Sequence, residues 1–346
     1  QSMPAAQLSL YSMEENRYVW GNMASQLVYQ APTKQMAPHQ SGMRFQVRDG
    51  DILQAIYERD GVMAKRQLKT IFWPEKTDRA MEKRLTKLYR LGYLDWPGPL
   101  DWRTKPIPEP ICWLGAKGVL WVAASNGVTL DIPPGENESW KRRLEVKLRE
   151  QGIYWMREPR WIQLQHDLRV GDFRLITEQA ISAHPSWELE TWQHEGIFRS
   201  HVDTVEYTVA GLDGQPKKMR KGVIPDSFFM LQDTGTGQTR ARFLLELDMA
   251  THDNPSFGRE KVLPGINYIL SSQYKARFDD NSGRWLVVTT GERRMQNLKR
   301  QAESIAGNAA QAFYFTTFDQ ISPQTVLSQP IWYRGGSNEP EALLQY

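Results

Sequence analysis

The segment over residues 77–92 constrains the fold of this chain more than any other part of its sequence. Its apolar residues Met81, Leu85 and Leu88 recur at intervals of four and three, which is the period of one face of an α-helix. A threonine and an aspartate at its start are typical helix caps, and Gly92 can end the helix. We therefore predict a helix that buries one face and presents lysine and arginine on the other.

Two helices are expected before this segment, and two strands and a helix after it. Arg48–Arg59 and Ala64–Phe72 carry apolar residues at helical spacing, and a Trp-Pro pair ends the second helix. Tyr93–Trp96 and Ile111–Leu114 are predicted strands joined by a wing-like loop, and Lys117–Ala124 is a closing helix. This order is typical of a winged helix-turn-helix, which places its third helix in the major groove of DNA.

The cations of the third helix recur at spacings of three and four, so they share one face. We predict that this face contacts duplex DNA, with phosphates supplying most of the affinity, and that cations of the second helix contact the flanking backbone. The predicted DNA-binding residues are Lys65, Arg66, Lys69, Lys76, Arg79, Lys83, Arg84, Lys87 and Arg90. The main alternative is a winged helix that serves only as a protein-interaction module.

The length of 346 residues favours two domains. Residues 1–45 have no sustained periodicity and are interpreted as an irregular arm, with one short helix near Trp20–Tyr29. Residues 46–125 form the expected winged helix. Residues 126–152 contain a polar, proline-containing linker and a charged helix, and residues 153–346 form a mixed α/β domain.

Three carboxylates fall on two apolar strands of the second domain. Asp226 lies at the start of one strand, and Glu246 and Asp248 lie on the next, where alternate side chains share a face. Ionised carboxylates among apolar residues are costly unless a cation or donor compensates them. Clustered carboxylates also suit Mg²⁺. We predict no certain cofactor, with Asp226, Glu246 and Asp248 as ligands of Mg²⁺ if the site is active.

The order of helix, three strands, helix and strand resembles the core of the PD-(D/E)xK nucleases. Asp226 follows a proline and Glu246 lies on the next strand, as in the motif of that family. Asp248 stands where the family has a lysine that orients the attacking water, and Lys261 or Arg259 could replace it from the following segment. The candidate catalytic residues are Asp226, Glu246, Asp248 and Lys261, and Glu195 would be the acidic residue of the family's first helix.

A structural role for the same residues is the alternative. Asp226 and Glu246 could form a buried ion-pair network with the nearby cations, and Asp248 could cap the next helix together with the Thr251-His252 pair. We expect a nuclease-like fold that does not cleave, because a fold does not by itself imply an activity.

Several segments in a particular order carry a second resemblance, which covers most of the chain beyond residue 45. They are Arg48–Leu94, Trp113–Gly118, Trp192–Glu195, Ile224–Phe229, Phe243–Asp248 and Leu286–Arg294. Together they resemble the replication-relaxation family of bacterial plasmid and mobile-element proteins. The resemblance implies DNA binding in the replication or mobilisation of such an element.

Composition excludes several other classes. Cys112 is the only cysteine, so no internal disulfide or cysteine-rich zinc site can form, and a reducing cytosol suits the chain. The apolar runs are too short to span a bilayer, and the N-terminus lacks a signal-peptide pattern. The net charge of +3 does not by itself identify a nucleic-acid binder.

The resulting hypothesis is a cytoplasmic, two-domain α+β protein that binds double-stranded DNA in replication, mobilisation or transposition. Its nuclease-like domain would serve as a platform for DNA or for other proteins of the complex, and a homodimer is a further expectation. The alternatives are a Mg²⁺-dependent endonuclease and a dimeric transcription regulator.

Overall fold

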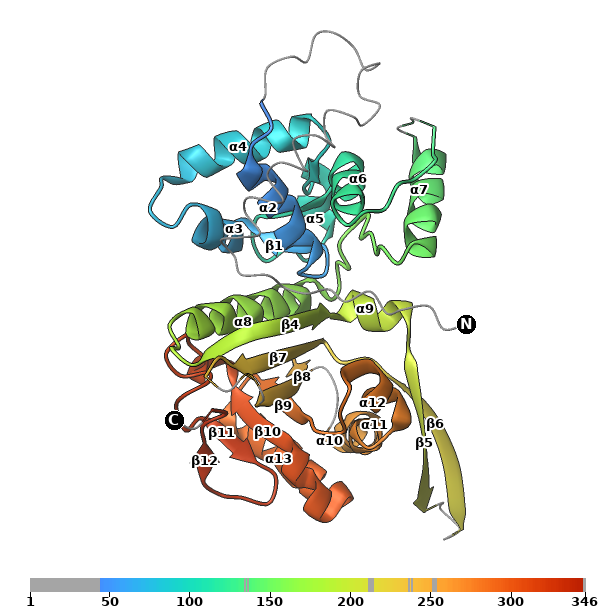
Figure 1. Cartoon of the computed structure of the whole chain (residues 1–346), viewed down its shortest axis with the longest axis vertical. Helices are drawn as coiled ribbons and strands as arrows, with labels where there is room; N and C mark the ends of the chain where they lie inside the picture. The colour runs from blue at the N-terminus through green and yellow to red at the C-terminus, as the bar shows by residue number, and fades with distance from the viewer. Residues whose placement is uncertain are drawn as a thin grey trace. The chain divides into compact units, whose positions relative to one another are not determined.

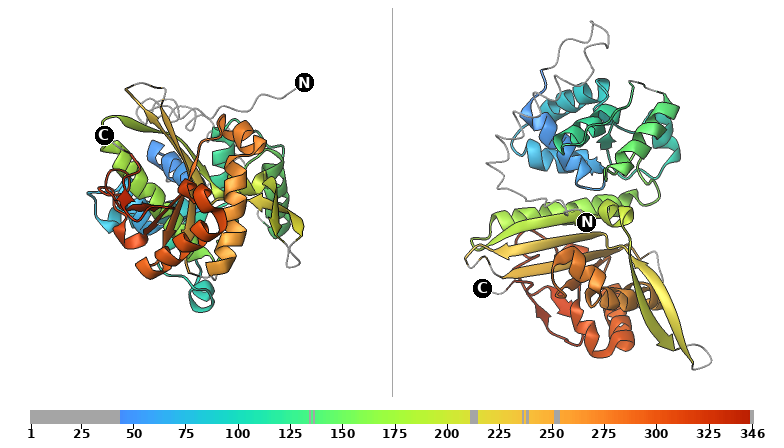
Figure 2. Two further views of the ribbon diagram at one scale, coloured as in Figure 1. Left: turned by 90° about the horizontal axis from the view of Figure 1, so that it is seen from below. Right: turned by 45° about the vertical axis from the view of Figure 1, so that its right-hand side comes forward.

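The chain forms two compact units in a computed structural model (Figure 1, with further views in Figure 2). The structure describes residues 44–133, 135, 137–210, 215–235, 237, 239–250 and 254–344. The first unit extends to Gly171 and the second begins at Asp172. The predicted helix near Trp20–Tyr29 and the arm up to residue 43 lie outside the described residues.

The first unit contains three helices at its start and a small antiparallel sheet. The helices are α2 (Val47–Tyr57), α3 (Lys65–Phe72) and α4 (Asp78–Arg90), followed later by α5 (Pro99–Thr104), α6 (Ala116–Ser125) and α7 (Glu138–Glu150). The strands are β1 (Val62–Ala64), β2 (Leu94–Asp95) and β3 (Ile111–Leu114), paired in the order β1-β3-β2. In this sheet, Met63 lies opposite Cys112 and Leu94 opposite Leu114.

Helix α4 has the boundaries that its sequence predicts. Met81, Leu85 and Leu88 are buried, and Thr77 occupies the N-cap position. The helix ends where Gly92 adopts a φ of +78°, and the Tyr93 N–H donates to the Leu88 carbonyl at 2.9 Å. A left-handed residue that closes such a bond is a common helix terminator and favours glycine.

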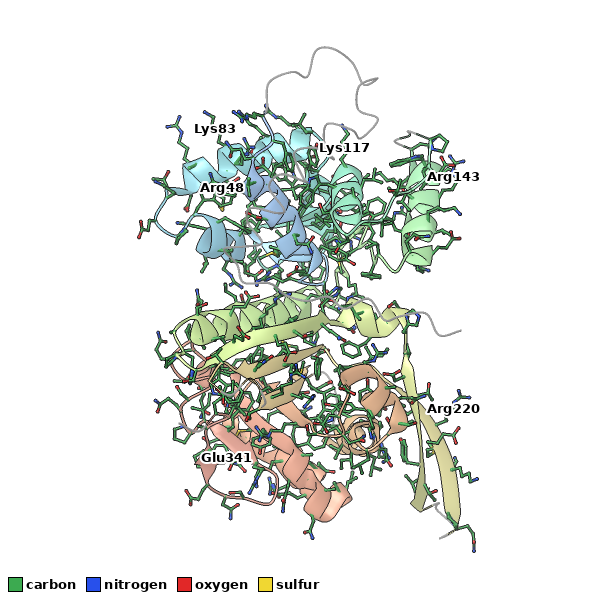
Figure 3. The ribbon with its side chains drawn as sticks, in the orientation of Figure 1. Arg48, Lys83, Lys117, Arg143, Arg220 and Glu341 are labelled. Carbon is green, nitrogen blue, oxygen red and sulfur yellow. The ribbon has the colours of Figure 1, made fainter. Side chains whose placement is uncertain are left out.

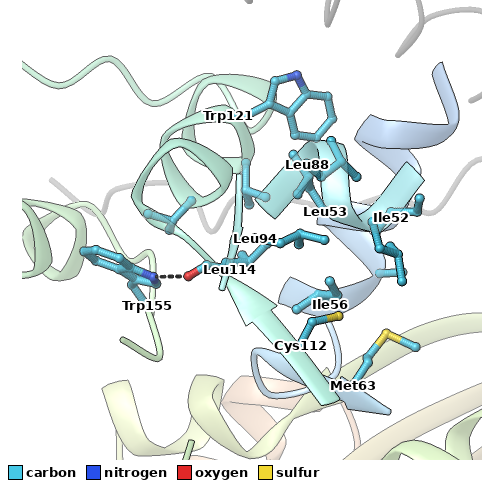
Figure 4. Close-up of a cluster of buried hydrophobic side chains, with 14 of the residues drawn as sticks. Ile52, Leu53, Ile56, Met63, Leu88, Leu94, Cys112, Leu114, Trp121 and Trp155 are labelled. Atoms are coloured by element: carbon cyan, nitrogen blue, oxygen red, sulfur yellow. Dashed lines mark hydrogen bonds between the residues drawn. The ribbon is translucent and has the colours of Figure 1, made fainter. Parts of the chain in front are cut away.

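One hydrophobic core joins the elements of the first unit (Figure 4). Ile56 of α2 and Leu88 of α4 belong to it, and the Trp155 indole N–H donates to the Leu114 carbonyl at 3.0 Å. Trp140 and Leu144 of α7 belong to the same core. The region predicted as a linker and a separate helix is therefore packed into the first unit, and the boundary lies after Gly171 instead of at residue 153.

The second unit is built on a seven-stranded mixed sheet of order β12-β11-β10-β9-β8-β7-β4. The strands are β4 (Trp187–His194), β7 (Ser227–Asp233), β8 (Arg240–Asp248), β9 (Arg284–Thr289), β10 (Phe313–Thr317), β11 (Trp332–Arg334) and β12 (Pro340–Glu341). The meander β4-β7-β8 is antiparallel, β8-β9-β10 is parallel, and the last two pairings are antiparallel. The chain is therefore of the mixed α+β class.

Helices cover both faces of this sheet. On one face, Phe173 of α8 (Leu164–Ser182) contacts Trp192 of β4 and Phe229 of β7. On the other face, Phe228 stacks on Phe278. The covering segments there are α10 (Asn254–Phe257), the π-helical turn η2 (Gly258–Val262), α11 (Leu263–Ile269), α12 (Ser272–Phe278) and α13 (Glu292–Ala306).

The segment between β4 and β7 begins with a short helix, α9 (Glu195–Ser200). Strands β5 (Asp203–Ala210) and β6 (Pro216–Val223) then form a separate two-stranded antiparallel ribbon, which Figure 2 shows projecting from the second unit. The remaining short helices are η3 (Gly307–Ala312) and η4 (Phe318–Gln320). Among the described residues, no helix is both long and apolar enough to cross a membrane.

Candidate nucleic-acid interface and acidic cluster

A groove of about 300 Å³ runs beside α4 in the first unit. Its lining residues come from the start of α2, the end of α3 and one side of α4, and they are Gln46, Arg48, Trp73, Lys76, Ala80, Lys83, Arg84 and Lys87. Figure 3 labels Arg48 and Lys83, which extend from two different helices at this end of the unit. The groove therefore combines a wall rich in cations with one buried tryptophan.

The predicted DNA-binding cations fall into two groups according to their partners. Lys76, Arg79, Lys83, Lys87 and Arg90 are all exposed. Within the part of the chain that the structure describes, no ion pair joins any of these five to a carboxylate. Their charge is therefore available to an anionic partner.

The other predicted cations are paired inside the unit. Lys65 contacts Glu82 at 2.8 Å, Arg66 contacts Glu109 at 2.8 Å, and Lys69 contacts Asp78 at 2.5 Å. Partly exposed surface pairs of this kind contribute at most about 1 kcal/mol. Carboxylate pairing thus lowers the positive charge that α3 presents, while the exposed charge of α4 stays uncompensated.

Arg84 differs from its neighbours because it is mostly buried. Its guanidinium donates to both carboxylate oxygens of Asp49 in the first turn of α2, and to the Arg44 carbonyl at 3.0 Å. Asp49 is fully buried. This contact fixes the start of α2 against α4, so Arg84 holds one wall of the groove in place.

The groove is lined by some of the cations predicted to contact DNA. Lys76, Lys83 and Lys87 line it, whereas Arg79 and Arg90 do not. The structure adds Arg48, whose guanidinium lies 5.1 Å from the centre of the Trp73 ring. Sequence reasoning missed Arg48 because its place beside α4 depends on how two helices pack.

In the second unit, Lys261 forms an ion pair with Glu246. The Lys261 ammonium lies 2.7 and 2.8 Å from the two carboxylate oxygens of Glu246, and its side chain is 37% exposed. Lys261 belongs to the π-helical turn η2, directly before the proline-containing helix α11. Of the two cations that could replace the family's lysine, it is therefore Lys261, and not Arg259, that forms this contact with Glu246.

The pKa of Lys261 reports the charges around it. Burial alone would lower this pKa, but the carboxylates of Glu246, Asp226 and Glu195 and the hydrogen bond to Glu246 outweigh that effect and raise it. The lysine is therefore fully charged at neutral pH. Glu195, Asp226, Glu246 and Lys261 form a cluster that we call the acidic cluster. The charged Lys261 interacts with all three carboxylates and partly offsets their negative charge.

Asp226 is bound to the backbone of the neighbouring strand. One of its carboxylate oxygens accepts a hydrogen bond from the Leu247 N–H at 2.7 Å, and its own N–H donates to the Leu245 carbonyl at 2.9 Å. Glu195 pairs with Arg199 one helical turn later, at 2.5 Å. These contacts join the start of β7 to β8 and stabilise the first turn of α9.

Asp248 has a different cation. It accepts two hydrogen bonds from Arg294 of α13, at 2.8 and 2.9 Å, and one from the Thr289 hydroxyl at 2.6 Å. Asp248 thus pairs with Arg294, whereas Glu246 pairs with Lys261. In the described ranges, no three His, Cys, Asp or Glu side chains converge on a point that could hold a metal ion. The acidic side chains of β8 thus do not fit a Mg²⁺ site as they are placed. Thr251 and His252, the predicted capping partners of Asp248, lie outside the described residues.

Comparison with known proteins gives one result. Neither the curated proteins nor the solved structures include a match to this chain. A family model described as replication-relaxation matches residues 53–263. That range is more than half of the chain and includes α4, the ribbon and the residues of the acidic cluster. The chain therefore belongs to the replication-relaxation family.

Proposed function

We propose that this protein binds double-stranded DNA through the first unit, in the replication of a plasmid or other mobile element. Family membership suggests the replication role. One observation carries the DNA-binding proposal: Lys76, Lys83 and Lys87 line one groove with Arg48 and have no carboxylate partner among the described residues. Such a surface attracts a polyanion and gains affinity by releasing the counterions of DNA.

The order of elements in the first unit supports a winged helix-turn-helix. Helices α2, α3 and α4 come first, β1 precedes α3, and β2 and β3 follow α4 as a hairpin whose connection contains α5. In this architecture the third helix enters the major groove and the hairpin forms the wing. Helix α4 is thus the helix that would meet DNA, and its exposed cations lie where that architecture needs them.

The composition of the α4 surface favours positioning over sequence reading. Phosphate contacts orient a protein on the duplex, whereas base edges carry the sequence information. The polar side chains that line the groove beside α4 are cations, together with the amide of Gln46. We therefore propose that this unit holds the protein on duplex DNA with modest sequence preference.

The test is the salt dependence of duplex binding. The double variant Lys83→Ala/Lys87→Ala should lower the slope of log affinity against log salt by about 2, since each lost phosphate contact removes about 0.9. The matched control is Arg142→Ala/Arg143→Ala, which removes two exposed cations from α7 of the same unit. Equal slopes for the wild type and the α4 variant, or an equal drop in the control, would overturn the proposal.

For the second unit, we propose a nuclease-like platform that does not cleave. The succession of α8, the antiparallel meander β4-β7-β8, covering helices and the parallel strand β9 supports a likeness to the PD-(D/E)xK core. The carboxylates of β8 each hold an internal cation, Lys261 for Glu246 and Arg294 for Asp248. This pairing supports a structural role for the strand carboxylates.

A nicking assay separates the platform from the endonuclease alternative. Supercoiled plasmid incubated with the full chain and Mg²⁺ should stay intact. Mg²⁺-dependent nicking that disappears in Glu246→Gln but persists in Arg293→Ala, an exposed control on α13, would establish the nuclease instead. Thermal denaturation of Glu246→Gln and Arg293→Ala shows whether the second unit stays folded in each variant.

A further inference from the structure

The β5–β6 ribbon is a second feature with the shape and charge of a nucleic-acid contact. Its two strands pair over eight residues each without a register shift, from Asp203 opposite Val223 to Ala210 opposite Pro216. At about 3.3 Å per residue, each strand is roughly 26 Å long. Figure 1 shows the ribbon extending away from the sheet and helices of the second unit.

The base of the ribbon is firmly anchored. Asp203 accepts hydrogen bonds from the Tyr268 hydroxyl at 2.6 Å and from Arg277 at 2.7 Å. Val205 and Val223, at the same end, are buried in the core beneath α11 and α12. The base of the ribbon is therefore fixed to the unit, which lowers the entropy cost of holding it against a partner.

Alternation along the strands separates a packing face from an exposed face. Cross-strand partners share a face, so Glu206 pairs with Arg220 and Thr208 with Lys218 on one side. All four of these residues are exposed. Lys217 is also exposed, on the opposite side of the ribbon.

Most of the charge on the described ribbon is positive and lies on strand β6. Strand β6 carries Lys217, Lys218, Arg220 and Lys221, and among the described residues one of these four forms an ion pair, Lys221 with Glu260 at 3.8 Å. On β5, Asp203 is already bound at the base. Glu206, opposite Arg220, is the acid that remains on the exposed face of the described ribbon. Towards the far end, Lys217 and Lys218 face Val209 and Thr208.

From this geometry we infer that the β5–β6 ribbon binds a groove of duplex DNA, with Lys218 and Arg220 contacting phosphates. The major groove is about 12 Å wide and accepts a two-stranded ribbon as well as a helix. Cations on the ribbon then reach the backbone at the groove wall. The inference concerns a surface of the second unit that is separate from α4.

The exposed face favours duplex DNA over two other occupants. Single strands bind through stacking on exposed aromatic rings, and none of the exposed residues of the described ribbon is aromatic. The aromatic residue of the ribbon, Tyr207, packs against the core of the unit. A protein partner that docks by apolar burial would find Thr208, Lys218 and Arg220 instead of large apolar side chains.

The first experiment compares the wild type, the ribbon variant Lys218→Ala/Arg220→Ala, the α4 variant Lys83→Ala/Lys87→Ala, and their combination. Fluorescence anisotropy on a labelled duplex gives the affinity at several salt concentrations. The ribbon variant should lower the salt slope by about 2 and weaken binding roughly tenfold. The control Arg293→Ala/Arg300→Ala removes the same charge from α13 and should bind as the wild type does.

The two proposals fail in different ways. If the α4 variant binds weakly and the ribbon variant binds as the wild type does, the ribbon inference is overturned and the proposed function stands. If only the ribbon variant is weakened, the role of α4 is overturned and the ribbon inference is supported. A ribbon variant that loses affinity for single strands more than for duplex would also overturn the inference.

A cross-link gives a readout that does not depend on charge. Cys112 is fully buried, so Thr208→Cys introduces the accessible thiol needed to attach a photocrosslinker. Irradiation with duplex DNA should produce a covalent adduct from residue 208. The control Gln311→Cys, exposed on η3, should produce none. Equal adduct yields from the two positions would overturn the inference.

Discussion

The Arg84 guanidinium of α4 forms a bidentate contact with the buried carboxylate of Asp49 in α2. The two residues are 35 positions apart in the chain. The same Asp49 carboxylate accepts the Gln46 N–H at 2.7 Å, so it also caps its own helix. One charge pair thereby fixes the angle between the two helices whose side chains line the groove beside α4. Arg84 thus supports the surface that we propose for DNA binding, while its own charge is paired with that of Asp49.

Arg84→Ala should destabilise the first unit by about 3 kcal/mol, because it leaves the Asp49 carboxylate buried without its partner. Lys83→Ala, one position earlier and exposed, should change the free energy of unfolding by less than about 0.5 kcal/mol. Urea denaturation followed by tryptophan fluorescence measures both variants. Equal stabilities would show that the pair has no structural role.

Gly118→Ala should destabilise the first unit by about 2 kcal/mol, although alanine favours helix. A methyl group at this position of α6 would lie 2.1 Å from the Tyr93 carbonyl oxygen, a backbone atom that cannot rotate away. The overpacking penalty therefore exceeds the gain in helix propensity of about 1 kcal/mol. Gly98→Ala is the control, because its nearest neighbour would be at 3.6 Å. A Gly118→Ala protein as stable as Gly98→Ala would contradict this account.

The helices and central strands could be predicted where local pattern and local stop signals coincide. Helix α4 has an apolar period, a cap residue and a terminating glycine within one short segment, so its boundaries agree with the prediction. Strand β9 is a continuous apolar run buried on both faces, and such runs are typical of parallel sheets. In both cases the information lies within a few residues of the element.

The elements that escaped prediction depend on distant partners. Strand β1 has three residues and exists because Val62–Ala64 pairs with β3. Strand β4 mixes charged, polar and aromatic residues, and its strand state depends on pairing with β7.

The candidate site also depends on distant partners, which the sequence does not reveal. The carboxylates and cations could be chosen from the sequence, but packing decides that Glu246 contacts Lys261 and Asp248 contacts Arg294.

Cys112 should resist thiol reagents in the folded protein. It is fully buried in β3, and burial raises the pKa of its thiol to about 12, so almost no thiolate exists at pH 8. A chromogenic disulfide reagent should label less than one equivalent over minutes in the native protein and one full equivalent in urea. The ratio of the two rates reports how often the core of the first unit opens. Fast labelling without denaturant would contradict the buried position.

Asp95→Asn should stabilise the first unit at pH 7, and the gain should fade in acid. Burial raises the pKa of Asp95, and the nearby Lys141 only partly offsets this. Above the raised pKa the carboxylate is charged in both states and its burial costs stability. Below the unfolded-state value of about 3.9, it is protonated in both states and the cost disappears. Unfolding free energies of the two proteins measured from pH 7 down to pH 4 should therefore converge. A difference in unfolding free energy that grows as the pH falls would contradict this prediction.

Arg294→Met tests whether Asp248 is a structural residue or a metal ligand. Asp248 is only 7% exposed, and Arg294 supplies two of its hydrogen bonds. Removing the guanidinium should cost about 3 kcal/mol, because the carboxylate stays buried with only the Thr289 hydroxyl. The double variant Arg294→Met/Asp248→Asn should recover part of this loss, since the uncompensated charge is gone.

Adding Mg²⁺ should not rescue the single variant, because Glu246 is paired with Lys261 and is not available as a second ligand beside Asp248. Thermal denaturation with and without Mg²⁺ measures all three proteins. A Mg²⁺-dependent rise in melting temperature for Arg294→Met that is absent from the double variant would show that Asp248 can bind the metal once Arg294 is removed. That result would support the nuclease alternative.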